Sequence, residues 1–130
     1  MGRDIEAVHA KDAPRAVGPY SQAVSAGGFV FVSGSIPLDP ATGEVVEGGI
    51  AEQTARAIEN ARCILNACGL GLENVVKTEV FLRDMDDFAG MNAAYATFFT
   101  AEPRPARTTV EVSRLPRDVL VEISCVAYRG

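Results

Sequence analysis

The stretch Val119-Leu120-Val121-Glu122-Ile123-Ser124-Cys125-Val126-Ala127 predicts a β-strand with apolar residues on both of its sides. A strand with one solvated face would alternate apolar and polar residues, so this strand is expected to be buried on both faces of its sheet. Monomeric proteins rarely leave a large apolar sheet face exposed to water. We therefore expect helices to cover one face of the sheet and a second copy of the chain to cover the other.

Other strands are predicted on the N-terminal side of this stretch. Residues 18–26 and 29–34 indicate two strands joined by Gly27-Gly28, a spacing typical of a two-residue hairpin. A loop rich in Pro and Gly follows, and residues 44–46 allow a short strand within it. Residues 75–82 and 107–113 complete the set together with the final strand, which is expected to run over 119–128.

Two helices are predicted between these strands. Apolar residues recur at helical spacing over 50–68, and Gly69 is suited to a left-handed C-terminal cap. Asp84 or Asp86 would cap a second helix, which Pro103 would end. The resulting order is β-β-(β)-α-β-α-β-β. Successive connections in one sheet tend to keep one hand, so both helices are expected on the same face of the sheet.

Composition limits the classes of protein to consider. The 130 residues are 48% hydrophobic, which is enough for one core and predicts a single domain over residues 1–130. No apolar run approaches the roughly 20 residues that would span a bilayer, and the N-terminal residues are too charged for a signal peptide, so a cytoplasmic location is expected. The net charge of −5 disfavours nucleic-acid binding.

Metal and cofactor chemistry is not expected from the residues present. The three cysteines form no CxxC pair, and His9 is the single histidine, so no metal set and no Ser-His-Asp triad can be assembled. No phosphate-binding GxxxxGK motif occurs, and no cofactor fingerprint follows a strand. An enzyme with this sequence would therefore use carboxylate, guanidinium, hydroxyl groups and water.

Two charged residues in apolar strands are the candidates for chemistry. Arg107 opens a strand, where its planar guanidinium can bind a ligand carboxylate by two parallel hydrogen bonds or pair with an acid of its own chain. Glu122 interrupts an apolar strand. If buried, its pKa would rise to suit proton transfer near neutral pH; alternatively it is solvated or paired with an arginine. Tyr20, Ser33 and Asn92 can hydrogen-bond a ligand but also serve structural roles.

The sequence resembles the RidA/YjgF family of reactive intermediate deaminases along nearly its whole length, from about residue 8 to residue 128. The motifs that carry the resemblance appear in the family's order: Ala13-Pro14, Gly18-Pro19-Tyr20-Ser21-Gln22-Ala23-Val24, Ser33-Gly34, Ile36-Pro37, Asp39-Pro40, Thr42-Gly43, Gln53-Thr54, Val76-Lys77, Asn92, Tyr95, Pro105-Ala106-Arg107, Leu115-Pro116 and Val121-Glu122-Ile123. A series of this kind is far more specific than any one motif.

The resemblance implies an α+β fold like that of chorismate mutase, with a mixed β-sheet and two helices on one face. It implies a homotrimer with active sites between subunits that hydrolyses 2-imino or 2-enamino acids, such as 2-aminoacrylate, to 2-keto acids and ammonia. No metal and no organic cofactor would take part. Arg107 would hold the substrate carboxylate, and Glu122 would activate water and manage protons. Tyr20, Ser33, Gly34 and Asn92 would line or shape the substrate cleft.

The sequence departs from the family's pattern at three positions. Ser35 stands where the family commonly has glutamine, Thr109 where many members have cysteine, and Ala10 where threonine is usual. The shorter side chain of Ser35 would alter substrate preference. The change at Thr109 removes a thiol but none of the residues expected to act in deamination.

Functions of other classes compete with deamination. Some relatives lack the arginine and would be non-catalytic ligand-binding or regulatory proteins, but Arg107 and Glu122 are both retained here. A ribonuclease or translation-inhibitor role is a further hypothesis, and the acidic balance of the chain counts against it. A chaperone-like role would need exposed apolar surface, which oligomer formation would bury.

Overall fold

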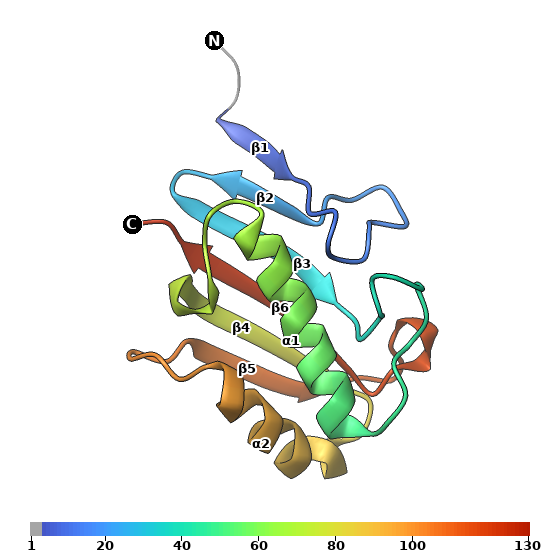
Figure 1. Cartoon of the computed structure of the whole chain (residues 1–130). Helices are drawn as coiled ribbons and strands as arrows, with labels where there is room; N and C mark the ends of the chain where they lie inside the picture. Colours follow the sequence, from blue (N-terminus) through green and yellow to red (C-terminus); the bar gives the residue numbers. More distant parts are fainter. Residues whose placement is uncertain (1–3) are drawn as a thin grey trace.

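The computed structural model describes residues 4–130 as one six-stranded mixed sheet with two helices on one of its faces (Figure 1). The strands are β1 (Ile5–Val8), β2 (Ala23–Ala26), β3 (Phe29–Ser35), β4 (Val75–Leu82), β5 (Ala106–Glu111) and β6 (Val121–Tyr128), and the helices are α1 (Ile50–Asn66) and α2 (Phe88–Phe98). Both helices lie on the same side of the sheet, as predicted from the order of elements. The predicted α+β fold is confirmed.

The strand order is β1-β2-β3-β6-β4-β5, so the last strand of the chain lies inside the sheet between β3 and β4. All pairs are antiparallel except β4 with β5, which are joined through α2 and run parallel. Helix α1 packs against β3, β6 and α2. Neither helix within residues 4–130 is both long and apolar enough to cross a membrane.

Strand β6 shows how differently the two faces of the sheet are covered. Val121, Ile123 and Ala127 point toward the helices and are fully or almost fully buried. The alternate residues, from Glu122 to Tyr128, point to the face without helices and are only partly buried or are exposed. This second face, called here the open face, is therefore uncovered in a single chain, and its burial by another copy stays a prediction.

The predicted hairpin between β2 and β3 is present. Gly27 and Gly28 form its turn with φ values of +58° and +88°, which glycine adopts without the steric cost that other residues meet. Strand β4 covers residues 75–82 as predicted. Residues 44–46 do not form a strand, because Val45 makes only an isolated bridge with Leu38.

Several element boundaries differ from the prediction. The sequence predicts a first strand over 18–26, but residues 18–22 form a loop and only β2 pairs with its neighbours. A strand at Ile5–Val8, which the sequence pattern does not indicate, lies at the sheet edge beside β2. Helix α2 begins at Phe88 after a 3₁₀ turn over Met85–Asp87, and in that turn Asp84 accepts a hydrogen bond of 2.9 Å from the Asp86 backbone N–H.

Candidate functional site

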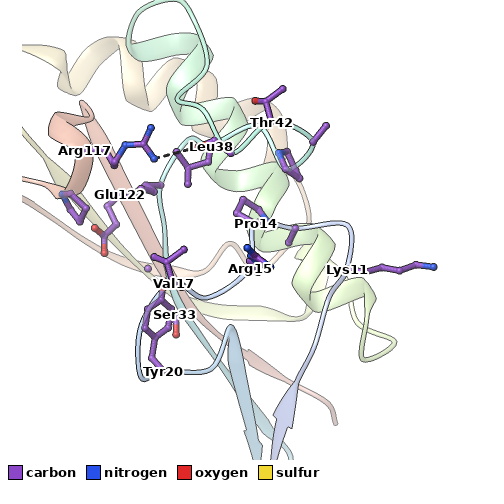
Figure 2. A pocket seen from close by; sticks show the side chains of 17 residues that line it. Lys11, Pro14, Arg15, Val17, Tyr20, Ser33, Leu38, Thr42, Arg117 and Glu122 are labelled. Atoms are coloured by element: carbon purple, nitrogen blue, oxygen red, sulfur yellow. Dashed lines mark hydrogen bonds between the residues drawn. The ribbon is translucent and has the colours of Figure 1, made fainter.

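A cavity of about 1050 Å³ lies where the loop over residues 11–20, the segment after β3 and the turn before β6 meet. Figure 2 shows the side chains that line it. Four of the sequence-predicted site residues are among them: Tyr20, Ser33, Gly34 and Glu122. The remaining two, Arg107 and Asn92, do not line this cavity.

The carboxylate of Glu122 points into the cavity from the open face of β6 (Figure 2). Within residues 4–130 it has no hydrogen-bond or ion-pair partner. Burial raises its pKa above the usual value for a glutamate. The hypothesis that Glu122 pairs with an arginine of its own chain is therefore not supported among the described residues. A half-buried carboxyl with a raised pKa and no partner is suited to exchanging protons with a ligand or water.

Gly34 makes room for this carboxylate. The β3–β6 register is irregular between Val32 and Ser35, so the backbone at Gly34 runs close to the Glu122 side chain. A Cβ atom placed on Gly34 would lie 1.9 Å from Glu122 Oε2 and 2.8 Å from its Cδ. Register irregularities of this kind often re-aim side chains beside functional sites. Gly34 therefore allows Glu122 to occupy its position in the cavity.

Replacement of Gly34 with alanine should displace the Glu122 carboxylate while leaving the fold intact, because the φ angle of Gly34 lies outside the left-handed region. We expect any activity that depends on Glu122 to fall at least about tenfold, since misplacing a reacting group by about 1 Å has effects of that size or larger. Activity and circular dichroism should be measured together. Gly49→Ala is the matched control, because its Cβ would meet only one atom, at 4.0 Å. Equal activity of the two variants would contradict this role for Gly34.

The loop that carries Tyr20 is held by the buried side chain of Gln22, the residue directly before β2. Its Oε1 accepts a 2.7 Å hydrogen bond from the Ala10 backbone N–H, and its Nε2 donates to the carbonyls of Ala10 and Pro14. Ser33 Oγ donates a 2.7 Å bond to the carbonyl of Ser21. Sequence reasoning includes Gln22 in a motif but gives it no role of its own. A polar side chain placed directly before the apolar residues Ala23 and Val24 is the signal that could have identified it.

The opposite wall of the cavity is held by a buried side chain of helix α1. Asn60 Nδ2 donates hydrogen bonds to the carbonyls of Ile36 and Leu38, at 3.1 and 2.9 Å. These bonds fix the segment after β3 against the helix. Ser35, expected near the cleft, points to the helix side and lines a small adjoining pocket of about 80 Å³, outside the main cavity. Any influence of Ser35 on a ligand would therefore be indirect.

Arg107 lies on β5 and is oriented by helix α2. Its Nη1 donates a 2.7 Å hydrogen bond to Asn92 Oδ1, and its guanidinium lies 4.8 Å from the ring centroid of Tyr95 and 5.6 Å from that of Phe88. Burial raises the pKa of Tyr95, so this phenol stays neutral and forms no ion pair with Arg107. No carboxylate within residues 4–130 pairs with Arg107. Its guanidinium therefore keeps donors available for a ligand.

Arg107 and Glu122 lie on opposite faces of the sheet. Arg107 is in register with Thr78 of β4, whereas Glu122 is in register with Phe81 of the same strand. Side chains alternate between faces along a strand, so positions three residues apart point to opposite sides. Thr78 is fully buried beneath α2, and its hydroxyl lies 2.7 Å from that of Tyr95. One chain alone thus does not bring Arg107 and Glu122 together.

The described residues contain no group of three or more His, Cys, Asp or Glu side chains that could hold a metal ion. Cys63 and Cys68 are partly buried free thiols, and Cys125 is buried. Burial raises the pKa of Cys125 to about 12, so this thiol is protonated and unreactive at neutral pH.

Residues 10–129 match the protein family described as Endoribonuclease L-PSP. The chain belongs to this family. A RutC family protein from Pyrococcus horikoshii is 52% identical over 124 residues, covering 95% of this chain and 98% of that protein. A Salmonella typhimurium protein named 2-iminobutanoate/2-iminopropanoate deaminase is 47% identical over 121 residues, covering 92% and 94%.

Among solved structures, the crystal structure of the YjgF gene product from E. coli is similar, with a TM-score of 0.90 and 43% identity. The similarity covers 96% of this chain and 99% of that one. The resemblance to the RidA/YjgF family inferred from sequence motifs is thereby confirmed. Membership of the L-PSP family also accounts for the mixed six-stranded sheet and its two helices.

Proposed function

We propose that this protein hydrolyses reactive 2-imino and 2-enamino acids to 2-keto acids and ammonia. The observation that carries the proposal is the half-buried carboxyl of Glu122, which has a raised pKa and no partner among residues 4–130, in a cavity also lined by Tyr20 and Ser33. The name of the Salmonella relative, at 47% identity, supports the same activity. Proteins of this activity class remove reactive metabolites before they cause damage.

The chemistry requires little more than an oriented water and a fixed substrate. The carbon of a protonated imine is already electrophilic, so water adds to it as the Glu122 carboxylate accepts one of the water's protons. The C–O bond forms and the C=N bond becomes single. Glu122 then returns the proton to nitrogen, the C–N bond breaks and ammonia leaves. The ionised carboxylate accepts the hydroxyl proton as the hydroxyl becomes the keto group, and it passes this proton to the departing ammonia. Holding water and substrate together converts an encounter into an oriented reaction.

The substrate carboxylate would be bound by Arg107. Its guanidinium is fixed by Asn92 and by the rings of Tyr95 and Phe88, so little side-chain freedom is lost when a ligand binds. Two parallel hydrogen bonds from this group would set the orientation of the substrate relative to water. Since Arg107 lies on the opposite face from Glu122, the pair that acts on one substrate must come from two copies of the chain.

A homotrimer with sites between subunits satisfies this requirement. The open face of the sheet carries exposed apolar side chains, of which Phe29, Phe31 and Tyr128 form an aromatic cluster with ring centroids 4.9 to 6.4 Å apart. Apolar surface of this kind is stabilised by burial against another chain. A neighbouring copy seated on the open face would bring its β5 edge, with Arg107, toward the cavity that holds Glu122.

Replacing Phe31 with aspartate should dissociate the assembly, because a charge would have to be buried at the centre of the proposed interface. Light scattering should give about three times the 13.8 kDa chain mass for the parent protein and the single-chain mass for Phe31→Asp. Deaminase activity should be lost together with the assembly. Ala51→Asp is the control, because Ala51 is exposed on helix α1, on the other side of the sheet from the open face. A parent protein that is monomeric and active would contradict the shared-site arrangement.

The test of the proposed activity is keto-acid formation from imines generated in solution. An amino-acid oxidase acting on L-2-aminobutyrate or L-alanine supplies 2-iminobutanoate or 2-iminopropanoate, and semicarbazide competes for the imine as it forms. Added protein should increase keto-acid release and decrease semicarbazone formation. Equal rates with and without protein, across both substrates, would reject the deaminase proposal and favour a ligand-binding role.

Ribonuclease activity, which the family description names, finds less support in the charge distribution. Several arginines are paired with acids of the same chain: Arg62 with Glu59, Arg104 with Glu102, and Arg114 with Asp118. Nucleic-acid binding by a chain with a net charge of −5 and several neutralised arginines would be weak at physiological salt. Ribonuclease activity is tested by incubating a labelled single-stranded RNA with the protein and measuring its cleavage.

A further inference from the structure

The turn before β6 carries Arg117, which adds a positive charge to the cavity wall on the side away from Ser33 and Tyr20. Arg117 lies in the 3₁₀ turn Pro116–Asp118, and its side chain extends over the cavity toward the segment that carries Leu38 and Thr42 (Figure 2). The chain has a net charge of −5, yet the cavity is lined by Lys11, Arg15 and Arg117 and by Glu122 alone among the acids. Lys11 extends away from the cavity in Figure 2, whereas Arg117 extends across it.

The backbone that positions Arg117 is unusual. Arg117 and Asp118 have φ values of +59° and +55°, a conformation that non-glycine residues adopt at a cost. Strain of this kind persists where the surrounding structure holds it, and here the turn is fixed from outside the cavity: Arg83 Nη1 donates a 2.9 Å hydrogen bond to the carbonyl of Asp118. The turn therefore directs Arg117 toward the cavity at an energetic cost, which is common for residues with a ligand-binding role.

The guanidinium of Arg117 is only lightly used by its own chain. It donates one long hydrogen bond, 3.3 Å, to the carbonyl of Gly43, and it lies 3.8 Å from the exposed carboxylate of Glu44. Its sequence neighbour Asp118 does not neutralise it, because that carboxylate binds Arg114 at 2.9 Å and 3.5 Å. A guanidinium has five donors in a fixed fork, so most of its capacity remains for an anion in the cavity.

We propose that Arg117 binds a second carboxylate on the substrate, so that the protein accepts 2-imino dicarboxylic acids. This inference rests on the proposed deaminase function, in which Arg107 of a neighbouring copy takes the carboxylate next to the imine carbon. Glu122 and its water act at that carbon, and the substrate side chain extends along the apolar wall formed by Leu38 and Pro40 toward Arg117. The cavity volume of about 1050 Å³ accommodates a five-carbon substrate.

A matched pair of substrates tests the charge of the side chain while keeping its size constant. Amino-acid oxidases generate 2-iminoglutarate from L-glutamate and its uncharged counterpart from L-glutamine, and keto-acid release is measured with each. We expect the parent protein to have a higher kcat/KM for 2-iminoglutarate than for the amide. We expect Arg117→Gln to reduce the ratio of the two kcat/KM values at least about tenfold, because a hydrogen bond to a charged group is lost.

Two further variants separate a binding role from a structural one. Arg117→Lys keeps the charge and should retain part of the preference for 2-iminoglutarate. Arg104→Gln changes an exposed arginine that pairs with Glu102 and does not line the cavity, and it should leave the ratio as in the parent protein. If Arg117→Gln does not fold, the ratio of the two kcat/KM values in the parent protein and in Arg117→Lys still tests the role of Arg117.

The outcomes distinguish this inference from the proposed function. An unchanged ratio in Arg117→Gln, or a parent protein that prefers the amide, overturns the role of Arg117. Acceleration of 2-iminobutanoate without acceleration of 2-iminoglutarate rejects the dicarboxylate inference alone. No acceleration of any imine rejects the deaminase function and this inference together.

Discussion

Replacing Arg107 with alanine is expected to lower kcat/KM for 2-iminobutanoate by about 100- to 1000-fold, because two charge-assisted hydrogen bonds to the substrate carboxylate would be lost. The rest of the structure should change little. Arg107 makes one side-chain hydrogen bond, to Asn92, and stacks near two rings at the edge of the sheet. Initial rates over a range of imine concentrations, with light scattering on the same samples, provide the measurement.

Two comparisons make the Arg107 result specific. Arg104→Ala removes an exposed arginine three positions earlier that pairs with Glu102, and it should leave the rate unchanged. Asn92→Ala should cause a smaller loss of about tenfold, since it frees the guanidinium without removing it. Full activity of Arg107→Ala would show that another group binds the carboxylate.

The second large effect is expected at Glu122. Glu122→Gln keeps the shape of the side chain but removes its ability to transfer a proton, and the loss in kcat should be about 100- to 10,000-fold. Glu6→Gln, on the exposed strand β1, is the control substitution. A rate within error of the parent protein would exclude a proton-transfer role for Glu122.

The pH dependence of both rate and stability follows from the raised pKa of Glu122. As a general base, the carboxyl is active when ionised, so kcat/KM should fall as the pH drops through this raised pKa. The contribution of Glu122 to the free energy of unfolding changes with pH in the opposite direction. The folded state holds the proton more tightly than the unfolded state, so this group's contribution becomes less favourable as pH rises from the unfolded pKa through the folded one. Glu122→Gln should remove both dependences.

Mixing the two inactive variants tests whether a site takes one residue from each of two copies. Arg107→Ala chains retain Glu122, and Glu122→Gln chains retain Arg107. When the two are unfolded and refolded together in equal amounts, about one site in four would combine the two intact residues if assembly is random. Recovery of about a quarter of the parent activity is expected. Absence of recovery from correctly assembled mixtures would show that both residues act from the same chain.

Local sequence signals predicted those parts of the fold that depend on nearby residues. The two glycines at 27 and 28 allow the tight turn between β2 and β3, and the apolar residues of 75–82 form β4 over the predicted range. Strand β1 was missed because it has four residues, three of them exposed, and it owes its conformation to pairing with β2. The segment 18–22 resembles a strand in composition, but the side-chain hydrogen bonds of Gln22 hold the preceding residues in a loop.

The candidate site was predictable in its residue types but not in its geometry. Arg107 and Glu122 stand out as charged residues in apolar strands, and the structure orients one with α2 and places the other in the cavity. Their location on opposite faces depends on the register of both β5 and β6 with β4, which sequence spacing does not encode. Sequence spacing does not single out Arg117, because its direction is set by the backbone of the turn.

The opposite-face placement of Arg107 and Glu122 has a genetic consequence. In the proposed trimer, each chain supplies the arginine to one site and the glutamate to another. A chain that folds normally but lacks both residues would therefore inactivate two of the three sites in any trimer that contains two normal chains. Cells that carry one normal and one doubly defective copy of the gene would lose more than half of the activity, and the defective copy would act as a dominant allele.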